Sequence, residues 1–157
     1  MKSDDNSAKV TFPPPLVFIG FLLAGLVIDD IAGLDGFGLP LSLRLLLAAA
    51  MIGPGIALIF SALGGFRRAG TPPEPWREVT AFVASGVYRF TRNPMYLGMA
   101  AISLGLTVAL ESTAALLLLP IAIIAIRTQV IARKEAYMQQ AFGTPYSDYC
   151  KRVRRWL

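Results

Sequence analysis

Four apolar segments dominate this sequence and set its fold. They cover about residues 15–28, 41–63, 94–110 and 113–126. A transmembrane helix needs roughly 20 predominantly apolar residues, with a lower limit near 17. Because the last two segments are short, we expect their helices to extend into the polar flanks. The pattern predicts an all-α integral membrane bundle of about four transmembrane helices.

The composition agrees with a membrane location and excludes several kinds of chemistry. Of the 157 residues, 55% are hydrophobic and 16% are charged, whereas about a quarter are charged in soluble domains. There is no histidine, and Cys150 is the single cysteine, so we expect no imidazole base, no intrachain disulfide and no metal site. The net charge is +5, but its short blocks beside apolar segments fit lipid head groups and not nucleic acid.

The distribution of basic residues predicts the orientation of the bundle. Every lysine and arginine except Arg44 lies in the N-terminus, in the loop between the second and third segments, or in the tail from Arg127 onward. Cytoplasmic loops are the basic ones. We therefore expect both termini and the central loop to face the cytoplasm, in a membrane of the bacterial inner-membrane type.

A polar stretch, residues 85–98, lies at the start of the third apolar segment and reads SGVYRFTRNPMYLG. Asn93 suits an N-cap and Pro94 suits the first helical turn, so the asparagine side chain and the free amides would form an electropositive niche. Two explanations stay open. Tyr88, Tyr96 and the arginines anchor a helix in the interface, or they bind a ligand.

A second polar cluster follows the fourth segment and begins at Glu135, for which a solvated helix face with local ion pairs is the simpler explanation. Only Glu111 and Ser112 separate the third and fourth segments. The two segments should therefore form a tight antiparallel hairpin, and this hairpin brings both polar clusters to the same membrane face. Small residues of the third segment would allow its close packing: Gly98, Ala101, Ser103 and Gly105.

The C-terminal tail has a helical pattern of its own. Tyr146, Tyr149, Val153 and Trp156 recur at spacings of three to four residues, with basic residues between them. This spacing predicts a short cytoplasmic amphipathic helix that lies on lipid head groups.

The two polar clusters also follow the residue order of a known family. Gly86 to Gly98 reads G-V-Y-x-x-x-R-N-P-x-Y-x-G, and the tail supplies Glu135, Phe142, Gly143, Tyr146, Tyr149, Val153 and Arg155. This pair of motifs resembles the isoprenylcysteine carboxyl methyltransferase family, whose general plan the phospholipid N-methyltransferases share. The resemblance covers about residues 64–157, which would form the methyltransferase core. From the residues themselves we expect residues 1–12 to be a disordered cytoplasmic N-terminus and residues 13–63 to hold the first two transmembrane helices.

The resemblance implies a cofactor and a kind of substrate. Members of the family use S-adenosylmethionine in a pocket under cytoplasmic elements, and a lipid-like substrate enters from the bilayer. Asn93 would bind the methionine carboxylate or the adenine edge, the rings of Tyr88 and Tyr96 would face the sulfonium or the ribose, and Glu135 would take the ribose hydroxyls or the amino group. The positions that match the cofactor site of the family are Val83, Tyr88, Asn93, Pro94, Met95, Tyr96 and Glu135.

Two departures from the family concern the substrate side of the site. Lys134 stands where the family has the first of two adjacent acidic residues, and Val130 stands where it has a substrate-contacting arginine. Arg127 and Arg133 are candidates to replace that arginine. We therefore take Arg133 and Glu135 as the candidate catalytic residues.

The chemistry of methyl transfer leaves three functions open. A carboxylate is a nucleophile without a base, which favours carboxyl O-methylation of an isoprenylcysteine-like acceptor in a chain that has no histidine. A phospholipid amine would first have to lose a proton, for which Glu135 or a tyrosine is available. The third possibility is a non-catalytic scaffold or lipid-binding module, for which Lys134 is the best argument.

Overall fold

The computed structural model describes residues 12–74, 77 and 79–156, and these residues form helices and loops without a strand. The predicted disorder of residues 1–12 falls almost entirely outside this described part. A short 3-10 turn, Gly86–Arg89, precedes α3, and a π-helical turn, Arg127–Ile131, joins α4 to α5. The α-helices are α1 (Pro14–Ala32), α2 (Leu41–Arg68), α3 (Pro94–Ala109), α4 (Thr113–Ile126), α5 (Ala132–Phe142) and α6 (Thr144–Arg152).

Three helical stretches are long and apolar enough to cross a membrane. They are α1, α2 and the continuous run Thr113–Phe142, which joins α4 to α5. The fourth apolar helix, α3, has 16 residues and is shorter than an average span. The all-α membrane class is thereby confirmed, whereas the number of spans stays a prediction.

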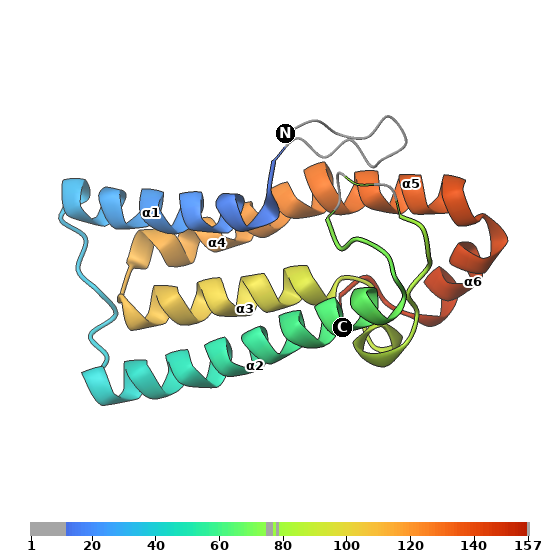
Figure 1. The fold of residues 1–157 in the computed structure, drawn as a ribbon. Coiled ribbons are helices and arrows are strands. Elements are labelled where there is room, and N and C mark those ends of the chain that lie inside the picture. Colours follow the sequence, from blue (N-terminus) through green and yellow to red (C-terminus); the bar gives the residue numbers. More distant parts are fainter. Residues whose placement is uncertain (1–11, 75–76, 78, 157) are drawn as a thin grey trace.

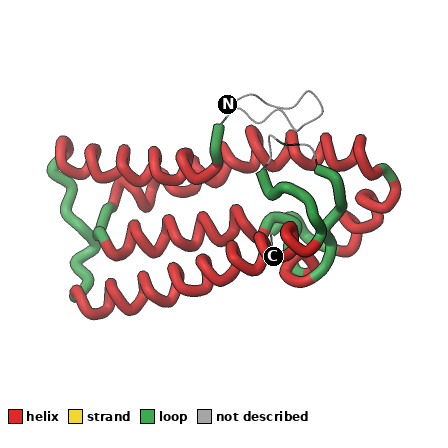
Figure 2. Tube along the Cα trace, in the orientation of Figure 1, coloured by secondary structure: helices red, strands yellow, loops and turns green. Residues whose placement is uncertain are grey.

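The helices form two layers. Figure 1 shows α1 beside α4 in one layer and α2 beside α3 in the other, in agreement with the closest helix pairs. The start of α1, the end of α2 and the start of α3 lie toward the end of the bundle that carries α5 and α6. Figure 2 shows that the loop between α2 and α3 lies at this end as well. The predicted meeting of the two polar clusters at one end is therefore correct.

Glycines set the close approach of α2 to α3. A Cβ atom added at Gly98 would lie 2.6 Å from the carbonyl oxygen of Gly55, and one added at Gly105 would lie 3.0 Å from that of Ala48. The small residues of α3 were expected to pack against α4, and this expectation is wrong for these two glycines. They face α2 because its own Gly55 and Ala48 leave room for a neighbouring backbone.

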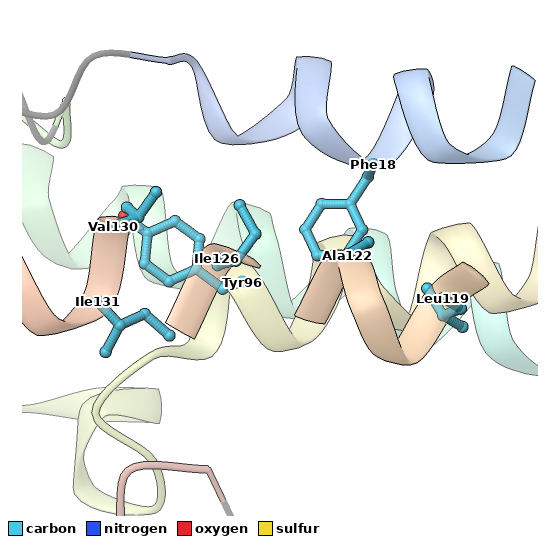
Figure 3. Close-up of a cluster of buried hydrophobic side chains, with 7 residues drawn as sticks. All are labelled: Phe18, Tyr96, Leu119, Ala122, Ile126, Val130 and Ile131. Atoms are coloured by element: carbon cyan, nitrogen blue, oxygen red, sulfur yellow. The ribbon is translucent and has the colours of Figure 1, made fainter. Parts of the chain in front are cut away.

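A cluster of buried apolar side chains joins α1, α3 and α4. Phe18 of α1 reaches toward Ala122 of α4, and the ring of Tyr96 lies near Ile126 and Val130 (Figure 3). Tyr96 is 5% exposed. This packing holds the first turn of α3 against the end of α4, next to the end of the bundle that carries the two polar clusters.

At the opposite end, Asp29 of α1 connects to the start of α4. Its carboxylate accepts hydrogen bonds from the Ser112 hydroxyl at 2.5 Å and from the Ala114 amide at 2.8 Å. The Ser112 oxygen in turn accepts from the Ala115 amide at 3.1 Å. Asp29 thus satisfies a free N–H of α4 and orients the Ser112 cap.

Replacing Asp29 by alanine should destabilise the protein by about 1–2 kcal/mol, because α4 loses one cap and the Ser112 hydroxyl loses its acceptor. Thermal unfolding in detergent measures the loss. Asp30→Ala is the matched control, since Asp30 is the exposed neighbour on the same helix. Equal unfolding temperatures for the two variants would contradict this role.

Candidate active site

The C-terminal tail packs against the residues that directly precede the N-terminal end of α3. The Arg92 amide donates to the carbonyl oxygen of Arg154 at 3.0 Å. The Asn93 side-chain amide and the Thr91 hydroxyl both donate to the carbonyl oxygen of Arg155, at 3.0 and 3.3 Å. Asn93 is the N-cap residue by position, but its side chain makes no capping hydrogen bond within the described chain. The prediction that the Asn93 side chain caps α3 is therefore wrong, because this side chain donates to the tail instead.

Glu135 is the central charge of this region. It accepts two hydrogen bonds from the Arg155 guanidinium, at 3.1 and 2.6 Å, and lies 3.3 Å from Arg92 Nη1. Its side chain is only 16% exposed. These contacts raise the pKa of Arg155 above its usual value through the hydrogen bond to Glu135. The simple solvated ion pair considered for Glu135 does not describe this largely buried arrangement.

A narrow cleft opens beside this network. It has a free volume of about 30 Å³, which is room for about one water molecule. Glu135 lines the cleft and is at the same time paired with Arg155. The residues that line it come from α2, the following loop, α5 and α6: Phe66, Val79, Ala81, Phe82, Val83, Tyr88, Arg92, Asn93, Lys134, Glu135, Met138, Tyr146 and Tyr149.

Aromatic residues form the wall of the cleft. The Tyr149 hydroxyl donates to the carbonyl oxygen of Tyr88 at 2.7 Å, and the Phe82 ring lies 5.1 Å from the Tyr149 ring and 5.7 Å from the Tyr146 ring. Burial raises the pKa values of Tyr88, Tyr146 and Tyr149 well above that of a free phenol. These tyrosines are therefore neutral at physiological pH, and none of the three is available as a proton acceptor.

Lys134 is held between aromatic rings. Its ammonium nitrogen lies 5.4 Å from the ring centre of Phe66 and 6.0 Å from that of Tyr96, which are cation–π distances. Lys134 and Arg92 line the cleft with one carboxylate, that of Glu135, which is paired with Arg155. The cleft is therefore electropositive and suited to an anionic group.

The structure brings together only some of the predicted site residues. Val83, Tyr88, Asn93 and Glu135 line the cleft. Pro94 is buried in the first turn of α3.

The remaining predicted residues lie elsewhere. Met95 and Tyr96 line a neighbouring cavity between the start of α1 and the start of α3. Arg133 is exposed on α5, donates to the Gln129 side chain at 3.3 Å and lines a different cavity. The candidate catalytic pair is thus separated, because Arg133 and Glu135 point to different sides of α5.

Several lining residues had no signal in the sequence. Phe66 ends an apolar helix, Phe82 lies in an irregular loop, and Met138 is an ordinary position of α5. They were missed because only long-range packing places them at the cleft. The tail contains a helix, α6, but this helix ends at Arg152, so Val153 and Trp156 of the predicted pattern lie beyond it. The predicted contact with lipid is wrong for Tyr146 and Tyr149. Both are buried against α5 and the loop before α3, which offers their rings a more complete apolar environment.

Fold and site together define an integral membrane protein with an electropositive cleft at one end of an apolar helix bundle. A sequence profile of phospholipid methyltransferases matches residues 43–145. The chain belongs to this family of membrane methyltransferases.

Two relatives illustrate the similarity. Protein-S-isoprenylcysteine O-methyltransferase of Schizosaccharomyces pombe is 29% identical over 108 residues, which is 62% of this chain and 46% of the yeast protein. The chain thus spans about half the length of that relative. An uncharacterized protein of Haemophilus influenzae is 41% identical over 63 residues, which is 40% of this chain and 100% of that protein. No solved structure shows significant similarity to the chain.

Proposed function

We propose that this protein transfers a methyl group from S-adenosylmethionine to a lipid-like acceptor in the membrane. The main support is the meeting of the Asn93 region and Glu135 at one cleft, at the end of an apolar bundle. With the basic loops at this end, the cleft would face the cytoplasm. Family membership and the name of the yeast relative support the reaction class.

The donor set of the cleft fits the cofactor. Arg92 Nε is buried and makes no hydrogen bond within the described residues, so an anionic group such as the methionine carboxylate would satisfy it. Glu135 would accept hydrogen bonds from the ribose hydroxyls or the amino group. The cofactor when bound supplies the methyl group and the leaving group, and the protein orients the acceptor and excludes water.

The small volume of the cleft sets a requirement for cofactor binding. About 30 Å³ is far below the roughly 300–1,000 Å³ of ordinary ligand pockets. Binding would therefore require the Arg155 side chain to leave Glu135 and the tail to move away from Asn93. The residues that hold the tail in place are thus the residues that the cofactor would engage.

Two acceptor groups are each supported by one observation. The electropositive cleft favours a carboxylate, as in an isoprenylcysteine-like acceptor, which needs no base. The family profile favours a phospholipid amine. Loss of a proton from the amine would then depend on Glu135, since the cleft tyrosines Tyr88, Tyr146 and Tyr149 are neutral phenols.

Native membranes that contain the protein should incorporate deuterated methyl groups when incubated with labelled S-adenosylmethionine. Mass spectrometry of the lipid extract identifies the labelled acceptor as a carboxyl ester or a methylated amine. Membranes without the protein are the control. A folded protein that binds S-adenosylhomocysteine but labels no lipid would contradict the proposal and favour a non-catalytic scaffold.

A further inference from the structure

The four residues after α6, residues 153–156, form a strap over the residues that precede α3. Figure 1 shows this part of the chain returning from α6 toward the start of α3. Apolar side chains hold both ends of the strap, because Val153 is buried in one apolar cluster and Trp156 packs against another. Between these ends the Arg155 side chain reaches Glu135.

Arg155 binds Glu135 in the way that a ribose would. Its Nε and Nη2 atoms donate to the two carboxylate oxygens, at 3.1 and 2.6 Å. Two adjacent ribose hydroxyls would present the same pair of donors to the same two oxygens. Arg155 and the cofactor therefore compete for Glu135. When Arg155 leaves, the carboxylate keeps a partner in Arg92, whose Nη1 atom lies 3.3 Å from Oε1.

The backbone of the strap also occupies donors at the edge of the cleft. The carbonyl oxygen of Arg154 accepts from the Arg92 amide at 3.0 Å, and that of Arg155 accepts from the Asn93 side chain at 3.0 Å. With the strap in this place the cleft has only about 30 Å³. The apparent affinity for a ligand of the cleft is thus reduced to the fraction of molecules in which the strap is open.

The outer side of the same segment carries positive charge. Lys151 and Arg152 end α6, Arg154 lies in the strap, and all three are exposed. Lys151 forms an ion pair with Asp148, but this pair is exposed and contributes little. An anionic surface is the complementary partner for such a cluster of cations.

An anionic membrane would favour the open strap over the closed one. In the closed state Arg155 and Trp156 are held by Glu135 and by apolar side chains. In the open state the strap gains a further cation for the head groups and a tryptophan for the interface, where tryptophan is enriched. This difference in contacts is what allows a membrane to shift the equilibrium.

The bilayer interface is within reach of the strap. Phe90 lies in the loop before α3, two residues from the Arg92 amide that binds the strap, and its side chain is 72% exposed. An exposed aromatic ring beside arginines, at the end of an apolar bundle, is typical of a segment that lies in the head-group region.

We propose that the strap is an autoinhibitory segment, which anionic lipid head groups release. Closed, it holds Glu135 and Asn93 and excludes the cofactor. Open, its cations bind head groups, Trp156 enters the interface, and Glu135 becomes available. The inference rests on the proposed function, since it concerns access of S-adenosylmethionine to the cleft.

The test compares the full chain in nanodiscs of phosphatidylglycerol and of phosphatidylcholine. Hydrogen-exchange mass spectrometry without cofactor follows residues 90–93, because the Arg92 amide is bound to the closed strap. A shift of about tenfold in the open fraction should make this exchange about tenfold faster in phosphatidylglycerol. Calorimetry should show S-adenosylhomocysteine binding about tenfold more tightly there. Equal exchange or equal affinity in the two lipids would overturn the proposal.

Variants separate the strap from general attraction to the membrane. Arg152→Gln/Arg154→Gln should lose the difference between the lipids and bind S-adenosylhomocysteine in phosphatidylcholine as the wild type does. Arg67→Gln/Arg68→Gln is the control, because it removes the same charge from the exposed last turn of α2, and it should keep the difference. Loss of the difference in both variants, or in neither, would refute the role of the strap.

The strap and the proposed function fail in different ways. Arg155→Gln should bind S-adenosylhomocysteine tightly in both lipids, because its strap no longer competes for Glu135. If this variant and the wild type bind none in either lipid, the proposed function is refuted, whereas faster exchange in phosphatidylglycerol would still support release of the strap. Methyl transfer at the same rate and affinity in both lipids would refute the strap alone.

Discussion

Glu135→Gln is expected to weaken binding of S-adenosylhomocysteine by about 10- to 100-fold, which corresponds to about 1.4–2.8 kcal/mol. The glutamine keeps the size of the side chain but removes the negative charge. It can no longer serve as the strong acceptor for ribose hydroxyls or an amino group. It also leaves Arg92 and Arg155 without their shared carboxylate, which adds repulsion between two cations. Calorimetry in detergent measures the dissociation constant.

The structural role of Glu135 needs a separate control. Arg155→Gln removes the same ion pair but leaves the carboxylate in place. If Glu135 binds the cofactor, Arg155→Gln should retain or improve binding, since the tail then no longer competes for Glu135. If Glu135 acts only through the fold, both variants should lower the unfolding temperature and weaken binding alike. That parallel behaviour, or unchanged binding in Glu135→Gln, would refute the assignment.

Gly98→Val is expected to lower the free energy of unfolding by about 2–3 kcal/mol. The added Cβ would lie 2.6 Å from the Gly55 carbonyl oxygen and 2.7 Å from the Ile59 side chain. A backbone carbonyl cannot rotate away as a flexible side chain can, so α2 and α3 must separate. This movement would also displace Asn93 at the start of α3 and with it one side of the cleft.

Gly20→Val is the matched control for this substitution. Gly20 lies in an apolar helix of the same bundle, and a Cβ atom there would meet nothing within 4 Å. It should cost little or nothing, because valine has a higher helix propensity than the glycine it replaces. Denaturation of both variants in detergent, followed by circular dichroism, compares them directly. Similar losses at Gly20 and Gly98 would contradict the close α2–α3 packing.

Local sequence patterns predicted the elements well and their contacts less well. The apolar runs gave the helices, and Pro94 marked the start of α3 where the structure has it. The expected extension of the short third and fourth segments is wrong for α3, which ends at Ala109, but correct for the fourth apolar helix. It continues through a π-helical turn into α5, because no proline or glycine interrupts residues 127–141.

The candidate site was likewise predicted only in part. The two motifs identified Tyr88, Asn93 and Glu135, and all three line the cleft. The choice of Arg133 depended on its neighbourhood in the sequence, and the helix turns that side chain away from Glu135.

The amino-acid sequence by itself determined a helical membrane protein with two polar clusters at one end, because segment length, charge bias and a short turn fix the path of the chain. Only the tertiary structure decided that α3 places its glycines against α2 and that the tail covers Asn93 and Glu135. The physical reason is that lipid is as apolar as a protein core. Membrane helices are therefore apolar on every side, and their sequence does not reveal which side faces a neighbour.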